Sequence, residues 1–156
     1  MKRNEHLHIL SHQHHNGLMA VLFLKKGVAK QADPAVMQDF VLQIWEQELR
    51  RHFLAEEIEL HPERLHVPGL VDYYEKMKRE HAAIRALILL FKSGPVFFEE
   101  IRKFYELLEQ HIRFEERELF ERIQEEVEPF VLEQIGKHLE GLPTGSCDRY
   151  PVKFWD

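Results

Sequence analysis

The chain has 156 residues, a length that suits one domain with a full hydrophobic core. Its formal net charge of −6 argues against a general attraction to nucleic acid or to an anionic membrane surface. No apolar run of about 18 residues occurs, so no transmembrane helix is predicted, and the first residues, MKRNEHLHILSHQHH, lack the apolar core of a secretory signal.

Apolar residues recur at helical spacing along most of the chain, and turn residues divide this pattern into segments. Asp33 can cap a helix that begins at Pro34, and the residue before Pro62 is biased away from helix. Ser93-Gly94-Pro95 marks a further break, and no strand pattern competes. The expected helices span about residues 4–27 (or as far as 30), 34–60, 68–92, 96–125 and 128–140, followed by an aperiodic tail at 141–156.

Four long helices with short connections predict an all-α fold, an up-down-up-down four-helix bundle with a short fifth helix. No linker is visible, so residues 1–156 are expected to form a single domain whose bundle takes about residues 4–125. We expect the tail to dock through its aromatic residues. Cys147 is the only cysteine, which excludes a disulfide within the chain and predicts a reducing, cytoplasmic location.

The second and fourth expected helices each contain the pattern HxxxEE. RRHFLAEEIEL contains His52 and Glu56, and EQHIRFEEREL contains His111 and Glu115. Residues four apart lie on one face of a helix, so an imidazole and a carboxylate at this spacing can bind the same metal ion. Apolar residues stand at matching offsets around both pairs, which is not typical of a solvated charged face. The sequence therefore predicts two ligand pairs that face the core.

The first and third helices also resemble each other, as HHNGLMAVLFLKKG and EHAAIRALILLFKSG show. When His15 is laid on His81, the apolar residues that follow coincide, Leu18 with Ile84 for example. This alignment predicts that His15 and His81 complete the site from the two remaining helices.

Alternatives to His15 remain open because His12 and His14 lie close to it. His14 and His15 point about 100° apart on a helix, so both cannot face one site. The second glutamate of each HxxxEE pattern, Glu57 or Glu116, is expected to be solvated or hydrogen-bonded to groups outside the ligand set rather than to be a ligand itself.

Four imidazoles and two carboxylates exceed the needs of one tetrahedral zinc ion. They suit two ions of higher coordination number that the carboxylates bridge. Nitrogen and oxygen ligands without a thiolate favour iron or manganese. Ferritin-like bundles use a pair of ExxH motifs on two long helices; no such pair occurs on the long helices expected here, and the order of the two residues is the reverse. The residues thus predict two carboxylate-bridged ions, iron or manganese, with zinc as a substitute.

These residues resemble the hemerythrin-like family, the HHE cation-binding domains, over about residues 5–125. The strings LRRHFLAEEIEL and EQHIRFEERELF carry the resemblance in combination with His15 and His81. The resemblance implies a four-helix bundle around a non-haem di-iron centre in which Glu56 and Glu115 bridge the irons. It also implies that O₂ or a related small molecule binds at an open iron position.

The chain departs from the oxygen-carrying members of that family at two places. Those members have a second histidine on the third helix at HxxxH spacing, whereas the positions four residues from His81 are Met77 and Arg85. Their carboxylate on the fourth helix is an aspartate five residues after the histidine, whereas Glu115 follows His111 by four. One missing imidazole argues against simple O₂ carriage and favours sensing or redox chemistry.

The resulting expectation is a metal-binding protein that binds or senses O₂, iron, NO or peroxide and is not an enzyme. A di-iron oxidoreductase would use the same ligands, so that alternative stays open. A histidine phosphotransfer bundle needs one exposed histidine, whereas the histidines here are matched and core-facing, so we rank it lowest. We expect no nucleic-acid or membrane partner and no catalytic residue beyond the metal ligands.

Overall fold

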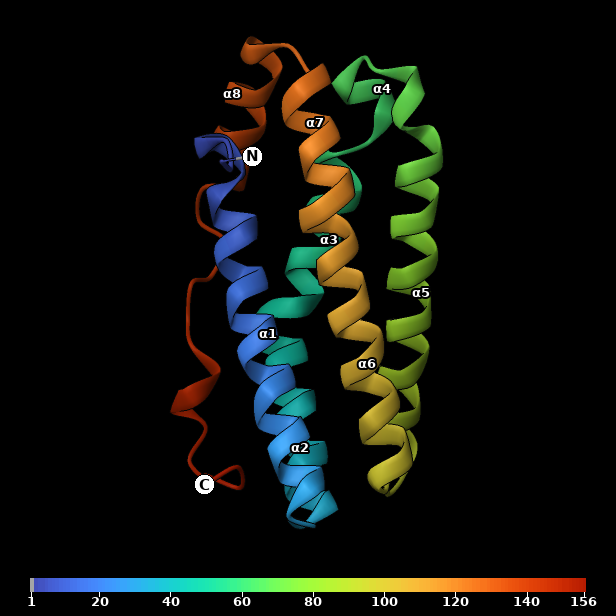
Figure 1. The fold of residues 1–156 in the computed structure, drawn as a ribbon, viewed down its shortest axis with the longest axis vertical. Helices are drawn as coiled ribbons and strands as arrows, with labels where there is room; N and C mark the ends of the chain where they lie inside the picture. The colour runs from blue at the N-terminus through green and yellow to red at the C-terminus, as the bar shows by residue number, and fades with distance from the viewer. Residues whose placement is uncertain (1) are drawn as a thin grey trace.

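A computed structural model describes residues 2–156, and this part of the chain folds as helices and turns (Figure 1). Four long runs of consecutive helical elements, called columns below, form the bundle. Two columns are single continuous helices, and two contain a π-helical turn. The bundle comprises α1 (His8–Ala29), α2 (Pro34–Ile44) with a π turn (Trp45–Leu49) and α3 (Arg50–Glu59), α5 (Val71–Ser93), and α6 (Phe98–Phe114) with a π turn (Glu115–Leu119) and α7 (Phe120–Glu126). The shorter elements are α4 (Pro62–Leu65), α8 (Pro129–Leu139), and 3₁₀ turns at Glu5–Leu7, Pro68–Leu70 and Cys147–Arg149.

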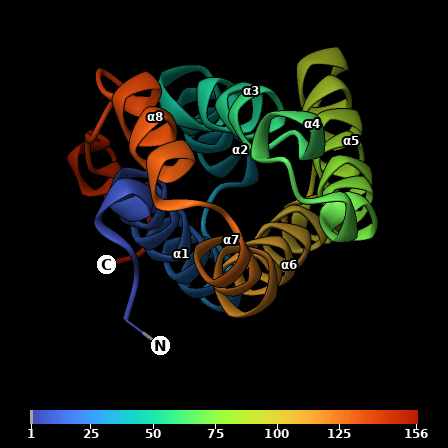
Figure 2. The same ribbon diagram turned by 90° about the horizontal axis from the view of Figure 1, so that it is seen from above.

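The columns alternate in direction, so the predicted up-down-up-down bundle is confirmed (Figure 1). Seen from above, α8 lies beside the N-terminal part of α1 and beside α3, and α4 lies next to the start of α5 (Figure 2). Within residues 2–156, no helix is both long and apolar enough to span a membrane.

Local signals explain where the helices begin. The Asp33 side chain accepts a hydrogen bond from the Ala35 backbone amide at 3.0 Å, and Pro34 occupies the first turn of α2, as predicted. Pro62 ends the second column, but it also begins α4, a single turn that the sequence analysis did not predict. His66 ends that turn in the left-handed region, at φ 58°.

The π turns are the second feature that the sequence did not predict. One turn ends at Leu49, three residues before His52, and the other begins at Glu115 itself. A π turn inserts an extra residue into the helical repeat and rotates the side chains that follow. Each π turn therefore sets which face of its column points inward near a predicted ligand.

The core consists of two apolar clusters, one toward each end of the bundle. Phe53 belongs to the cluster around α2 and the lower parts of α5 and α6, whereas Phe120 belongs to the cluster that α7 and α8 share with the start of α1. Phe53 stacks on His81 with ring centroids 4.0 Å apart, and Phe120 stacks on His14 at 5.2 Å. A layer of buried polar side chains thus lies between the two clusters.

The residues after α8 run along the outside of α1 toward the lower end of the bundle (Figure 1). Tyr150 and Phe154 are buried there, and Trp155 stacks on Phe23 with centroids 4.0 Å apart. The predicted docking of the tail through its aromatic residues is confirmed.

Candidate metal centre

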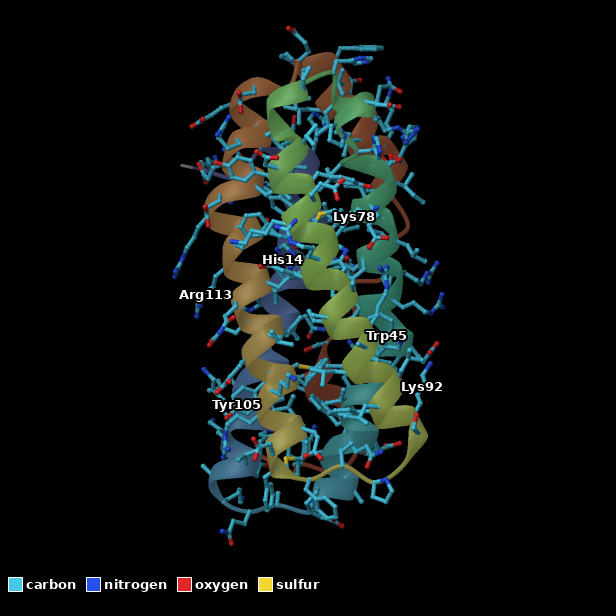
Figure 3. The ribbon with its side chains drawn as sticks, turned by 90° about the vertical axis from the view of Figure 1, so that its right-hand side faces the viewer. His14, Trp45, Lys78, Lys92, Tyr105 and Arg113 are labelled. Carbon is cyan, nitrogen blue, oxygen red and sulfur yellow. The ribbon has the colours of Figure 1, made fainter. Side chains whose placement is uncertain are left out.

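Six histidine and glutamate side chains meet in the polar layer between the apolar clusters, and His14 lies among the helices there (Figure 3). Each is almost fully buried, with relative exposures of 0% to 3%. Four different columns supply them. The six are His14 on α1, His52 and Glu56 on α3, His81 on α5, His111 on α6 and Glu115 at the start of the second π turn.

Both HxxxE pairs close as the helical spacing predicts. His52 Nε2 lies 3.1 Å from Glu56 Oε2, and His111 Nε2 lies 3.1 Å from Glu115 Oε1. The pairs come from opposite halves of the chain and face each other across the bundle interior. The sequence analysis therefore identified five of the six convergent side chains.

The six side chains form two tetrads that share both carboxylates. One tetrad consists of His14, His52, Glu56 and Glu115, and the other replaces the two histidines by His81 and His111. In each tetrad, one ligand atom from every residue lies within 4.8 Å of the others. Glu56 and Glu115 can thus contribute to two neighbouring cation positions, as bridging carboxylates do.

The prediction of His15 as the ligand on the first helix is wrong. The structure places His14 in the cluster, while both His15 and the alternative His12 are exposed. His14 Nε2 lies 2.9 Å from Glu115 Oε1 and 3.6 Å from Glu56 Oε2.

The error arose because α1 has two apolar faces. The face toward the bundle core carries Leu10, His14, Gly17, Val21 and Leu24 at alternating spacings of three and four. A second face, which includes Met19 and Phe23, packs against the core cluster and the residues that follow α8. Leu18 and Leu22, which supported the alignment on His15, are half-buried or exposed.

Gly17 obscured the inward face because it contributes no apolar side chain. A Cβ atom there would lie 2.8 Å from Ile112 Cδ1, so α1 and α6 approach closely at this position. When His14 instead of His15 is laid on His81, Gly17 falls on Ile84, and both residues are buried.

A hydrogen-bond partner behind each imidazole holds its outer nitrogen. The Nδ1 distances are 2.8 Å from His14 to Glu116, 2.6 Å from His52 to Gln13, 2.7 Å from His81 to Glu57 and 2.7 Å from His111 to Glu80. Each partner oxygen accepts, so each Nδ1 carries the proton and each Nε2 directs a lone pair inward, as in metal-ligating histidines.

Glu57 and Glu116 lie outside both tetrads, as expected, but they bond to the site histidines themselves rather than to solvent or to groups outside the ligand set, and sequence reasoning missed Gln13 and Glu80. These two residues directly precede the site histidines of α1 and α5, and each supports the histidine of the column that follows. The corrected alignment on His14 would have paired them.

The carboxylates make the site strongly attractive to positive charge. Burial disfavours the charged imidazoles, but neighbouring carboxylates outweigh it, raising the pKa of His14 well above its usual value and that of His111 to about 9. Burial likewise disfavours charge on Glu56, but the histidines around it hold its pKa well below the usual value. The centre therefore stabilises a cation, either a proton or a metal ion.

The residues present fit metal ions. Glu56 Oε2 and Glu115 Oε2 are fully buried and have no hydrogen-bond partner, which is costly for a carboxylate. The Nε2 atoms of His14 and His52 lie 3.0 Å apart, a contact at which the inward lone pairs would repel if neither Nε2 carried a proton or a metal ion. His81 and His111 repeat this contact at 3.1 Å. A cation at each tetrad would satisfy the nitrogen lone pairs and the carboxylate oxygens together.

Comparison with protein families agrees with this geometry. The model of the hemerythrin HHE cation-binding domain matches residues 6–123, which is most of the chain. The chain belongs to the hemerythrin HHE cation-binding family. Comparison with curated proteins and with solved structures found no match. The predicted family is thus confirmed, and the matched region contains all six convergent residues of this hemerythrin-like protein.

The positions around His81 show how this hemerythrin-like site differs from one with an additional imidazole. Met77 is fully buried in the upper apolar cluster. Arg85 turns away from the centre and donates to Glu57 Oε2 at 2.7 Å. Neither position supplies a ligand, so α5 contributes one imidazole.

Proposed function

We propose that this protein binds two non-haem iron ions through the two tetrads, and that it binds or senses a small molecule such as O₂, NO or peroxide there. The observation that carries the proposal is the sharing of Glu56 and Glu115 between two sets of buried imidazoles. A site for one ion would need only one of the two imidazole pairs that share these carboxylates.

The donor atoms support iron over softer metals. Each tetrad offers two imidazole nitrogens and two carboxylate oxygens, with no thiolate. Iron accepts five or six ligands, so four protein donors would leave positions open to an exogenous molecule. Bound iron would supply those open positions and reversible one-electron chemistry.

The protein itself supplies rigidity and exclusion of water. Glu57, Glu80, Glu116 and Gln13 fix the orientation of the imidazoles through Nδ1. The rings of Phe53 and Phe120 cover two of those imidazoles from opposite ends of the bundle. A small apolar molecule such as O₂ or NO suits such an interior better than a large polar substrate does.

We favour sensing over oxygen storage because Met77 stands four residues before His81, at HxxxH spacing, where the oxygen-carrying members can have a second histidine. Without that imidazole, an iron ion here would keep one more open coordination position. Histidine phosphotransfer does not suit these four histidines, since their exposures of 3% or less leave no ring nitrogen open to a phosphoryl donor.

Metal analysis with an optical spectrum tests the proposal. Protein produced in iron-supplemented medium should contain about two iron ions per chain and show the charge-transfer bands of an oxo-bridged ferric pair. Mixing the reduced protein anaerobically with O₂, NO or H₂O₂ should then give a stable spectral change without repeated turnover. Multiple turnovers would favour the oxidoreductase, and zinc alone after growth with iron would refute the di-iron proposal.

A further inference from the structure

The outer partner of His52 differs from the other three. His14, His81 and His111 each donate their Nδ1 proton to a glutamate, whereas His52 donates to the amide oxygen of Gln13. Hydrogen bonds to an ionised carboxylate are roughly twice as strong as bonds between neutral groups. His52 is thus the imidazole whose orientation depends most on how firmly its partner is held.

Gln13 is held by the part of the chain that follows α8. Its Nε2 donates to the Pro143 carbonyl oxygen at 2.7 Å, which fixes the amide so that Oε1 faces His52 Nδ1 at 2.6 Å. Gln13 is 2% exposed, so water does not replace either partner readily. A continuous chain of hydrogen bonds therefore leads from Pro143 to a candidate metal ligand.

The segment from residue 143 to 156, called the C-terminal segment below, lies outside the region that matches the family. It contacts α1 again just after His14, where the Cys147 backbone amide donates to Asn16 Oδ1 at 2.8 Å. Asn16 in turn donates to Glu48 on the neighbouring column at 3.1 Å. The C-terminal segment thus bonds to residues on both sides of His14.

The same segment is anchored far from the metal centre. Tyr150 donates to Asp39 Oδ2 at 2.6 Å, and its ring meets Phe40 edge-on. Phe154 packs so closely on α1 that a Cβ atom at Gly27 would lie 2.8 Å from its ring. These contacts lie toward the lower end of the bundle, so their loss would release the segment without removing any group of the metal centre.

We propose that the C-terminal segment sets the metal affinity of the tetrad of His14 and His52, with Gln13 as the positioning residue of His52. This inference rests on the proposed two-metal function. Undocking of the segment frees the Gln13 amide, and the His52 ring then loses its fixed orientation. His81 and His111 keep Glu57 and Glu80 on bundle helices, so their tetrad does not depend on the segment. The two metal positions are therefore unequal, and one responds to the state of the C-terminal segment.

Zn²⁺ is the probe for the test, because it is redox-inert and binds imidazole and carboxylate ligands. Calorimetric titration of the metal-free protein gives the affinity of each ion, and ¹⁵N NMR of the histidine rings reports each Nδ1 proton. Partner substitutions of this kind typically cost about 10–100-fold in metal affinity. We expect Gln13→Leu to weaken the binding of one of the two ions by this factor. Among the histidine signals, only that of His52 Nδ1 should shift or broaden.

A conservative variant separates positioning from packing. Gln13→Glu keeps an acceptor for His52 Nδ1 but buries a charge, whereas Gln13→Leu keeps an uncharged side chain. If Gln13 acts by positioning His52, Gln13→Glu should bind the ion of the His14 and His52 tetrad more tightly than Gln13→Leu does. It should do so even though the buried charge makes the unfolding free energy of Gln13→Glu lower than that of Gln13→Leu. Better metal binding by Gln13→Leu would overturn the role of Gln13.

The distant anchors provide the second arm. Tyr150→Ala with Phe154→Ala should weaken the same single ion and disturb the same His52 signal, whereas Val152→Ala, at an exposed position of the segment, should change neither. If the double variant does not fold, the two Gln13 variants still test whether Gln13 positions His52. Wild-type protein that binds fewer than two ions contradicts the proposed function. Wild-type protein that binds two, with unaltered binding in Gln13→Leu, overturns only the role of the C-terminal segment.

Discussion

His14 on α1 and His52 on α3 hold their Nε2 atoms 3.0 Å apart inside the bundle, although 38 positions separate them in the chain. Both rings are fixed from behind, by Glu116 and by Gln13. Neutral imidazoles in this arrangement direct two lone pairs at the same small space. The contact is stable only with positive charge between or on the rings, which is the physical basis of the metal assignment.

Replacement of His14 should remove one metal ion, whereas replacement of its neighbour should not. His14→Ala deletes an imidazole of one tetrad, so we expect the metal content to fall from about two ions per chain toward one. His15 is exposed, and His15→Ala should keep full content. Metal analysis of the two purified variants measures the difference. Loss of metal in His15→Ala but not in His14→Ala would show that His15 is the ligand.

Replacement of a shared carboxylate should be more severe than replacement of a histidine. Glu115 belongs to both tetrads, so Glu115→Ala is expected to abolish binding of both ions. Glu118→Ala is the control, because Glu118 is exposed on the same π turn. Titration with Fe²⁺ under anaerobic conditions measures the effect, and retention of one tightly bound ion in Glu115→Ala would argue against a shared carboxylate.

The HxxxE pairs could be read from the sequence because they depend only on local helical geometry. His52 reaches Glu56, and His111 reaches Glu115, within one turn of their own columns. The bundle itself followed from the same periodicity, together with the capping signal at Asp33. Such features require no knowledge of how distant segments pack.

Which face of α1 points into the bundle could not be predicted in the same way, because it depends on a distant segment of the chain. Phe23 looks like a core residue, but it faces Trp155 near the end of the chain. Gly17 looks like a poor core residue, but it allows α1 to approach Ile112. The partners Gln13 and Glu80 support histidines on other columns, and such pairs become visible only once the columns are placed side by side.

Removal of the metal should lower the stability of the whole bundle. The metal-free centre leaves Glu56 Oε2 and Glu115 Oε2 buried without hydrogen bonds, and metal binding is coupled to folding. Free metal at about 100 times the dissociation constant adds about 2.7 kcal/mol to the unfolding free energy. Urea unfolding with and without a chelator measures this difference. Identical midpoints in a protein that demonstrably contains metal would contradict the coupling.

The pH dependence of stability should include a contribution from Glu48, which lies beneath the C-terminal segment at a pocket of about 280 Å³. Burial raises the pKa of Glu48 from 4.5 to about 7, although Asn16 and His14 oppose the shift. The folded protein therefore holds a proton at Glu48 that the unfolded chain has already lost between these two values. Stability from this group falls as the pH rises through that window.

Glu48→Gln tests this directly, because glutamine is neutral at every pH and can still accept the hydrogen bond from Asn16. The variant should be nearly as stable as the wild type at about pH 5 and more stable at about pH 8, since only the wild type must bury a charge there. Urea unfolding of the metal-free proteins across this range gives the difference. Glu106→Gln, at an exposed position of α6, should show no such trend. Curves for Glu48→Gln and wild type that stay parallel from acid to alkaline pH would show that the Glu48 carboxylate is solvated, and that the C-terminal segment does not cover it in solution.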